Sequence, residues 1–313
     1  MEMKQLVAMV TVAEAGSVTH AAQMLHIVQP AVTRQIKTLE DELGVVLFDR
    51  TRQGMVLTSA GEVFLLRARR ALQEMERART ELTPQTGDVT GLVSVGVLES
   101  LLDVIVPPLA SSVAKRFPGV ELRIMSGFSG YLQKWLDDGV VDIAVLYNLA
   151  DTPAMRVKPL LSERLWAVAP ADAGLLPAEP VTWDRVLRGP LILPILGHGL
   201  RTLIDKARFD IPIEPKISLE TNSMSVQKQM VLAGRGWTIL PGAGVARDIQ
   251  EGTLSGAPLA EPRLSRSVVV GLQRAARIPR AVEAVNAELL RVSRNLVVSG
   301  AWPSATLVDA PKQ

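Results

Sequence analysis

The pattern of apolar and polar residues over the first 58 positions predicts three short helices. The first ends at Gly16, and Ser17 can cap the second because its hydroxyl can accept a backbone N–H. The third begins near Pro30, since the fixed φ of proline suits a first helical turn. One side of it is apolar and the other is polar and basic, with Gln29, Thr33, Arg34 and Lys37. Two short helices in this order are typical of a helix-turn-helix.

Two short apolar runs, Val45–Phe48 and Met55–Leu57, predict strands around a basic loop, which we interpret as a wing. From Thr58 the pattern is helical again, and one narrow stripe repeats at steps of three and four: Leu65, Ala68, Leu72, Met75, Arg79 and Leu82. That spacing is typical of a coiled-coil seam, so we favour pairing with a second copy of the chain. A helix packed on its own domain is the alternative.

After a short linker, Pro84–Thr90, strand runs alternate with helical segments and predict an α/β domain. The order over residues 92–146 is βαβαβ, which implies a parallel sheet with helices on its faces, and a second such series follows from residue 160. A last strand, Ser267–Leu272, and a helix, Arg280–Val297, could return to the first series. The tail from Gly300 is expected to be unstructured.

Composition narrows the chemistry that the chain can perform. Its 313 residues, 48% of them apolar, suffice for two domains with cores of their own. The chain has no cysteine and only three histidines, so neither a metal site nor a cofactor is expected. A net charge of +2 means that any basic character is local. The N-terminus lacks a signal-peptide core and no stretch approaches about 18 apolar residues, which predicts a cytoplasmic protein without membrane contact.

A dense set of motifs occupies the first 65 residues: Ser17–Glu40, Leu43–Gly44, Leu47–Arg50 and Leu57–Gly61. A weaker set follows: Phe117–Val120, Gly139–Ala144 and Gly234–Pro241. In order and spacing, these motifs closely resemble the LysR-type transcriptional regulators, from Met3 to about Val298. Leu25–Pro30 and the strand ending Leu146–Tyr147 look most like the branch that includes the nitrogen assimilation control regulator. Val28 departs from the family, which commonly has a small or hydroxyl residue there, and valine cannot cap a helix.

The resemblance implies a winged helix-turn-helix at residues 1–58, a dimerising linker helix at 59–90 and an effector-binding regulatory domain at 91–299, before a disordered tail at 300–313. The regulatory domain would comprise two Rossmann-like subdomains of the periplasmic-binding-protein type, residues 91–162 with 267–299, and residues 163–266. The implied function is sequence-specific regulation of transcription, switched by a small-molecule inducer in the cleft between the subdomains. The implied partners are double-stranded operator or promoter DNA, the inducer, and further copies in a homodimer and a homotetramer; contact with RNA polymerase is compatible with this layout.

A recognition helix presents its N-terminal residues to base edges, so the candidates for base contacts are Gln29, Pro30, Thr33, Arg34 and Lys37. Arg34 can read guanine and Gln29 adenine through paired hydrogen bonds. Arg50 and Arg52 in the wing are expected to meet phosphate or the minor groove. Residues 1–58 hold 5 Lys or Arg against 6 Asp or Glu, so this prediction depends on placement rather than net charge. For Arg50, an ion pair with Asp49 or Glu42 is the alternative.

In doubly wound sheets, ligands bind beside the C-terminal ends of strands and the N-termini of the next helices. That rule selects candidates from both subdomains: Glu99, Ser100, Ser129, Tyr147, Pro194, His198, Arg201 and Asn222. Ser100 and Ser129 match positions where many family members carry effector-binding Ser or Thr, and a plain helix cap is the alternative for each. Glu99 disfavours a dicarboxylate inducer unless Arg201 neutralises it, and it suits an amine or several hydroxyls; an acid that stabilises its helix N-terminus is the alternative.

Two other classes of protein compete with this interpretation. An enzyme would need a nucleophile with a base, paired carboxylates or a phosphate loop, and none of these motifs occurs; the one histidine near a candidate loop is His198. Residues 91–299 alone would resemble a periplasmic solute-binding module. A secreted binder would begin with a signal peptide, whereas this chain begins with a helix-turn-helix pattern.

Overall fold

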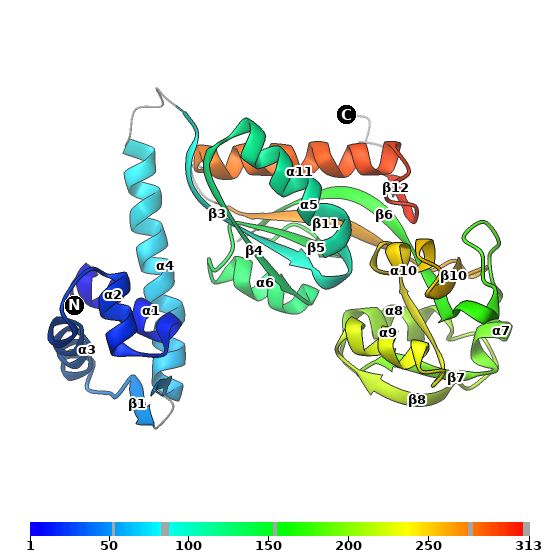
Figure 1. The fold of residues 1–313 in the computed structure, drawn as a ribbon, viewed down its shortest axis with the longest axis horizontal. Coiled ribbons are helices and arrows are strands. Elements are labelled where there is room, and N and C mark those ends of the chain that lie inside the picture. Colours follow the sequence, from blue (N-terminus) through cyan, green and yellow to red (C-terminus); the bar gives the residue numbers. More distant parts are fainter. Residues whose placement is uncertain (52–53, 83–87, 153–154, 275–277, 309–313) are drawn as a thin grey trace. The chain divides into compact units, whose positions relative to one another are not determined.

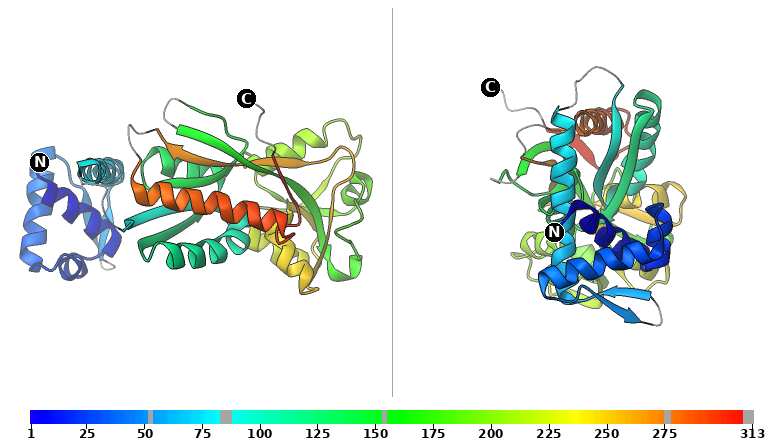
Figure 2. Two further views of the ribbon diagram at one scale, coloured as in Figure 1. Left: turned by 90° about the horizontal axis from the view of Figure 1, so that it is seen from above. Right: turned by 90° about the vertical axis from the view of Figure 1, so that its left-hand side faces the viewer.

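In a computed structural model of the chain, residues 1–51, 54–82, 88–152, 155–274 and 278–308 are described. They divide into two compact units, one within residues 1–87 with two short later segments, and one that holds most of residues 88–313. The first unit is mainly helical and the second combines sheets and helices (Figure 1, Figure 2). Among the described residues, no helix has both the length and the apolar character needed to span a membrane.

The first unit consists of three helices, a hairpin and a long helix: α1 (Met3–Ala15), α2 (Val18–Met24), α3 (Gln29–Leu43), β1 (Phe48–Thr51), β2 (Gly54–Leu57) and α4 (Ser59–Leu82). Gly16 ends α1 in the left-handed conformation, and Ser17 Oγ accepts the His20 N–H at 3.4 Å. Pro30 lies in the first turn of α3, and Val28 precedes it without a side-chain cap. These helix boundaries confirm the sequence prediction.

The wing differs from the predicted one. Val45 and Val46 form no strand, and the residues after them are held to α3, since Glu40 Oε1 accepts the N–H groups of Leu47 and Phe48 at 2.7 and 3.3 Å. Strand β1 therefore begins at Phe48 and includes Arg50, which was expected in a loop. Gly54 has φ +124°, and a Cβ there would lie 2.3 Å from Gly16 O, so only glycine lets the wing approach the α1–α2 turn this closely.

The predicted seam on α4 divides into two parts. Leu65 belongs to the core of the first unit, together with Met9 and Leu39, so this end of the helix packs on its own domain. Further along, Leu72 is half-buried and Met75 is 49% exposed. The side chains of Arg79 and Leu82 lie outside the described residues.

The first subdomain of the second unit is a sheet with helices: β3 (Thr90–Leu98), α5 (Leu102–Arg116), β4 (Gly119–Gly127), α6 (Ser129–Asp137), β5 (Ile143–Tyr147), β11 (Ser265–Gln273) and α11 (Arg280–Val298). Strand β3 runs parallel to β4 and β5, as predicted. The late strand β11 pairs with β5, and α11 packs on α5 and β3, so both return to this subdomain. Because β11 is antiparallel to β5, the sheet is mixed rather than parallel.

The second subdomain has its own strands and helices: α7 (Trp183–Leu187), β7 (Pro190–Pro194), α8 (Gly199–Ala207), β8 (Lys216–Thr221), α9 (Met224–Leu232), β9 (Trp237–Pro241), α10 (Ala246–Gln250) and β10 (Leu254–Pro258). Strand β7 is parallel to β8 and β9. The long strand β6 (Met155–Pro170) pairs with β11 as far as Arg164, and with β9 and β10 from Leu165 onward. It therefore runs through both subdomains.

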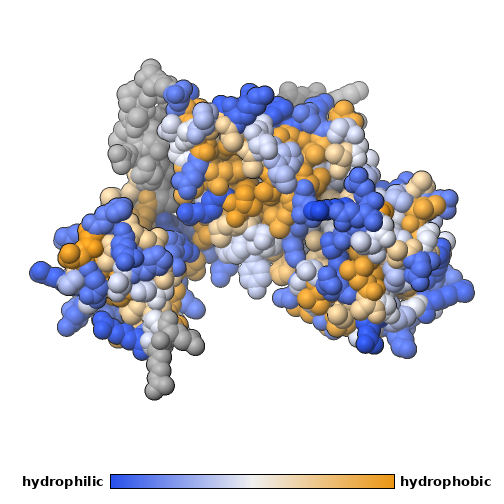
Figure 3. All heavy atoms as spheres, viewed as in Figure 1, coloured by the Kyte–Doolittle hydropathy of each residue, from blue (hydrophilic) through white to orange (hydrophobic). Residues whose placement is uncertain are grey.

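Apolar side chains gather on the first subdomain over the region of α5 and β4 (Figure 3). The strand order β4-β3-β5-β11-β6-β9-β7-β8 makes β4 an edge strand. Its apolar residues Val120, Leu122 and Ile124 are only half-buried. The first subdomain thus presents apolar surface beside a sheet edge.

The expectation of an unstructured tail from Gly300 is wrong for the residues described there. Strand β12 (Ala305–Leu307) pairs antiparallel with β6. Trp302 is 1% exposed, and its Nε1 donates to Glu163 Oε1 at 3.0 Å. A buried indole with a buried acceptor anchors the segment, whereas the glycine and prolines around it favoured disorder by composition. Residues 309–313 of the predicted tail lie outside the described residues.

Trp302→Phe should lower the free energy of unfolding by about 1–3 kcal/mol, because Glu163 loses a buried donor. Trp302→Ala should cost more, about 3–5 kcal/mol, since it also leaves a cavity. Urea denaturation of the full chain, followed by circular dichroism, measures both. Wild-type midpoints for both variants would contradict the anchoring role of this segment.

Candidate functional site

The outer face of α3 carries the residues predicted to read bases. Four of these residues are exposed, namely Gln29, Pro30, Arg34 and Lys37, and the fifth, Thr33, is half-buried. Gln29 Nε2 donates to Thr33 Oγ1 at 2.9 Å, and Thr33 Oγ1 lies 3.2 Å from Gln29 O. Arg34 and Lys37 form no ion pair within the described part of the chain. Their charges are therefore available to an anionic partner.

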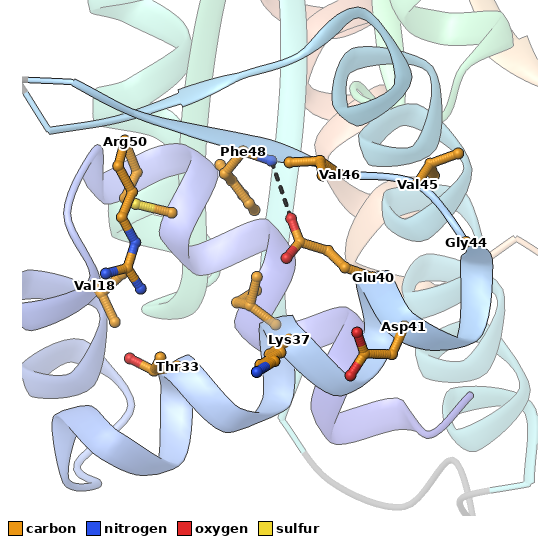
Figure 4. Close-up of a pocket in the computed structure, with 12 residues that line it drawn as sticks. Val18, Thr33, Lys37, Glu40, Asp41, Gly44, Val45, Val46, Phe48 and Arg50 are labelled. Carbon is orange, nitrogen blue, oxygen red and sulfur yellow. Dashed lines mark hydrogen bonds between the residues drawn. The ribbon is translucent and has the colours of Figure 1, made fainter.

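A groove of about 510 Å³ lies between α3 and the wing, and Thr33, Lys37 and Arg50 all line it (Figure 4). Arg50 extends from β1 toward the α3 side of this groove (Figure 4). The alternative pairing of Arg50 with Asp49 or Glu42 does not occur among the described residues. Glu42 instead pairs with the amino group of Met1, which lowers the pKa of its carboxyl. Arg52 lies outside the described residues.

A second cavity lies between the two subdomains of the second unit. It leaves about 50 Å³ that the centre of a water molecule can occupy, which is room for only a few waters or a small ligand. The predicted effector residues that line it come from both subdomains: Glu99, Ser100, Ser129, Tyr147, Pro194, His198 and Asn222. The rule that ligands bind at strand ends thus selected residues that the fold brings together.

Arg201 is the predicted effector residue that does not line this cavity. Its buried guanidinium pairs with Asp205 at 2.8 Å and with Glu220, and Nη1 donates to Pro194 O at 3.0 Å. The side chain therefore ties α8 to β8 and the end of β7. It is not placed to neutralise Glu99.

Sequence reasoning missed Arg266, which lines the cavity from β11. The guanidinium is buried, with Nε 2.8 Å from Glu163 Oε2 and Nη2 2.7 Å from Ser100 Oγ. Its carbon lies 5.1 Å from the centre of the Tyr147 ring. The rule used for the sequence considers the C-terminal ends of parallel strands. Because β11 is antiparallel, its beginning reaches the cleft instead.

Gln227 was also missed, and it lines the cavity from α9. The residue is 3% exposed, and its Nε2 is buried with no hydrogen-bond partner in the part of the chain that the structure describes. Helix α9 begins at Ser223, whose Oγ accepts the Val226 N–H at 3.4 Å. A glutamine one turn inside a helix that starts at a strand end was a signal available in the sequence.

His198 and Tyr147 join the subdomains across the cavity. His198 Nδ1 accepts the Leu200 N–H at 3.2 Å, and its ring meets Phe128 edge-on with centroids 4.8 Å apart. Burial, reinforced by Arg266, lowers the pKa of His198, so the imidazole is neutral near pH 7 and Nδ1 can accept. Burial raises the pKa of Tyr147, whose hydroxyl stays protonated. A Cβ at Gly199 would lie 2.6 Å from this hydroxyl, so the two walls meet closely.

Two family descriptions match this chain. Residues 3–62 match the bacterial regulatory helix-turn-helix protein of the lysR family, and residues 86–294 match the LysR substrate binding domain. The chain belongs to the LysR family. It is a LysR-type DNA-binding transcriptional regulator with a C-terminal effector-binding domain.

Curated relatives of this LysR-type protein are named as transcriptional regulators. The regulator BbuR of Bordetella bronchiseptica is 31% identical over 292 residues, covering 93% of this chain and 90% of its own. A probable nitrogen assimilation transcriptional activator of Synechococcus elongatus is 32% identical, covering 86% and 87%. The nitrogen assimilation regulatory protein nac of Klebsiella aerogenes is 29% identical, covering 93% and 94%. The resemblance to nitrogen assimilation regulators is thus confirmed.

Solved structures share the LysR-type fold. A full-length OxyR variant from Pseudomonas aeruginosa superposes with a TM-score of 0.73 at 23% identity, covering 100% of this chain and 99% of that one. Full-length CbnR in complex with its target DNA superposes with a TM-score of 0.67 at 23% identity, covering 94% and 99%. These matches span both the helix-turn-helix and the effector-binding domain.

Arg34→Ala should relax base selectivity at one position of the bound site, because a lost bidentate contact is worth about 1–3 kcal/mol of discrimination. Selection of binding sites from random duplex DNA, with wild type and variant in parallel, measures this. Arg263→Ala is the matched control, since it removes the same charge from an exposed arginine of the effector-binding domain. Identical selected sequences for Arg34→Ala and wild type would show that Arg34 reads no base.

Proposed function

We propose that this LysR-type regulator reads operator DNA with α3 and its wing, and that a small molecule in the cavity between the subdomains switches its effect on transcription. The observation that carries the proposal is the cavity itself, which residues of both subdomains line. A ligand that touches both walls binds one arrangement of the subdomains better than another. It can shift the regulator between states only through that difference in affinity.

Exposed polar and basic side chains support the DNA-binding half of the proposal. The residues that would meet base edges in the major groove are Gln29, Pro30, Thr33, Arg34 and Lys37. The wing residues that would meet phosphate or the minor groove are Arg50 and Arg52. Arg50 and Lys37 line one groove beside α3, together with Glu40 and Asp41, and the two cations are the groups there that would meet a phosphate. The structural neighbour CbnR was solved with its target DNA, which supports this use of the fold. A regulator of this kind works in the cytoplasm and performs no catalysis.

Self-association through α4 is the proposed assembly. Met75 is exposed on the seam of this helix, and a second copy would cover it. A tetramer needs another contact, and the apolar surface at β4 is the candidate for it.

Met75→Asp should dissociate the dimer, because a carboxylate would face its symmetry mate in an apolar seam, while the monomer loses little from an exposed site. Sedimentation equilibrium of the full chain measures the association. Val63→Asp is the control, since Val63 is 65% exposed on the same helix and lies off the seam. Equal association of Met75→Asp, Val63→Asp and wild type would count against the α4 interface.

Ser129→Leu should abolish the effector response by filling the cavity from the first turn of α6. Ser129 suits this test better than Ser100, whose hydroxyl already accepts a hydrogen bond from Arg266. Reporter expression from the native promoter, compared with operator binding in vitro, separates response from DNA binding. Ser299→Leu, at an exposed position at the end of α11, controls for the added bulk. A full response in Ser129→Leu would place the effector elsewhere.

A further inference from the structure

We propose that the ligand of the cavity between the subdomains is a short-chain monocarboxylate, whose carboxylate accepts hydrogen bonds from Arg266 Nη1 and Gln227 Nε2. This inference rests on the proposed function, because it gives the chemical class of the effector that the cavity would take. Three observations support it: two donors with no hydrogen-bond partner among the described residues, an acid with no ion-pair partner there, and the small size of the cavity.

The first donor is the remaining nitrogen of Arg266. Its Nε and Nη2 are used by Glu163 and Ser100. No hydrogen bond of Nη1 is found within the described residues, although the guanidinium lines the cavity. A guanidinium carries five N–H donors, and two of them belong to Nη1. The cavity wall thus includes a cationic group, Arg266, whose Nη1 can still donate hydrogen bonds to a ligand.

The second donor is Gln227 Nε2, which is buried in the opposite subdomain and has no hydrogen-bond partner among the described residues. A buried donor left unsatisfied costs free energy, so a ligand oxygen that accepts from it recovers that cost on binding. Both donors require an acceptor. A carboxylate supplies two acceptor oxygens on one carbon, and charge assistance makes its hydrogen bonds to a guanidinium strong.

Glu99 limits the ligand to one carboxylate. It lines the same cavity, and no cationic side chain pairs with it in the described part of the chain. A second ligand carboxylate near it would be repelled by a charge of the same sign. Arg201, the residue expected to relieve this repulsion, is held by Asp205 and Glu220.

The rest of the lining combines polar residues such as Ser129 and Asn222 with apolar ones, and the space is small. Apolar side chains complete the walls: Leu98, Phe128, Leu200, Met224 and Leu240. About 50 Å³ for the centre of a water molecule corresponds to room for a few heavy atoms. A monocarboxylate of two to four carbons, counting its carboxylate carbon, matches this space and this chemistry.

Thermal unfolding of the full-length protein tests the inference, with acetate, propionate and butyrate as probes and chloride at equal ionic strength as the reference. At least one monocarboxylate should raise the melting temperature saturably. Its primary amide should bind roughly tenfold to a hundredfold more weakly, because it lacks the charge that strengthens the Arg266 contact. Malonate should bind more weakly than propionate in the wild type, and Glu99→Gln should reduce that difference.

Gln227→Met is the decisive variant, because it removes the free donor and keeps a side chain of similar length. It should weaken monocarboxylate binding by at least about tenfold. Its melting temperature without ligand should not fall, since an unsatisfied donor is lost rather than a bond. Gln229→Met, at an exposed position two residues along the same helix, should bind as the wild type does.

Three results would overturn the inference: no saturable shift with any of the three acids, amides that bind as well as acids, or Gln227→Met that unfolds more easily and binds unchanged. The proposed function is tested separately by Ser129→Leu. If Ser129→Leu loses its response to the effector while no monocarboxylate binds, the cavity is still the effector site but the proposed ligand class is wrong. If monocarboxylates bind and Ser129→Leu still responds fully, the cavity is a monocarboxylate site but the proposal that it switches transcription is wrong.

Discussion

The two subdomains of the effector-binding domain depend on one buried ion pair, between Glu163 on β6 and Arg266 on β11. Glu163 is fully buried, and its Oε2 lies 2.8 Å from Arg266 Nε. Its Oε1 accepts from Ala243 N at 3.2 Å in the second subdomain, and from Trp302 Nε1 at 3.0 Å in the C-terminal segment. An ionised carboxylate without these partners would carry a large desolvation cost, and breaking such a pair typically costs about 3–5 kcal/mol. The pair therefore fixes the crossing strands, the second subdomain and the C-terminal segment at one point.

The position of this pair matters for the proposed switch. Arg266 also donates to Ser100 and lines the cavity, so one guanidinium connects the strand crossing with the ligand site. In the proposed switch, a ligand that binds Arg266 would change the charge balance beside Glu163. Because β6 runs through both subdomains, a change in its partners at Arg164 and Leu165 would alter the angle between them. Under the proposed function, this arrangement would link the ligand to subdomain geometry, which a population shift requires.

The helix-turn-helix could be predicted from sequence because its determinants are local. Each helix end is set by a residue within one turn of it: Gly16 ends α1, Ser17 caps α2 and Pro30 lies in the first turn of α3. The cavity was partly predictable, because the ends of parallel strands share one edge of a sheet. The positions of Arg266 and the C-terminal segment could not be predicted in this way. They depend on strands that pair antiparallel with residues about one hundred or more positions away in the sequence. Trp302 lay in a tail that was expected to be unstructured, because its acceptor, Glu163, is far away in the sequence.

The beginning of α3 is where a local rule fails, and the proposed function explains the failure. Val28 offers no side-chain oxygen to the free N–H groups of the first turn, which costs about 0.5–2 kcal/mol relative to a good cap. Its side chain is 69% exposed, so packing does not recover this cost. Pro30 recovers part of it, because its φ is already helical and it removes one N–H that would need a partner. The N–H groups that remain point out of the end of α3 that enters the major groove in the proposed complex, where phosphate or base oxygens can accept from them. A helix end that DNA can cap does not require a serine.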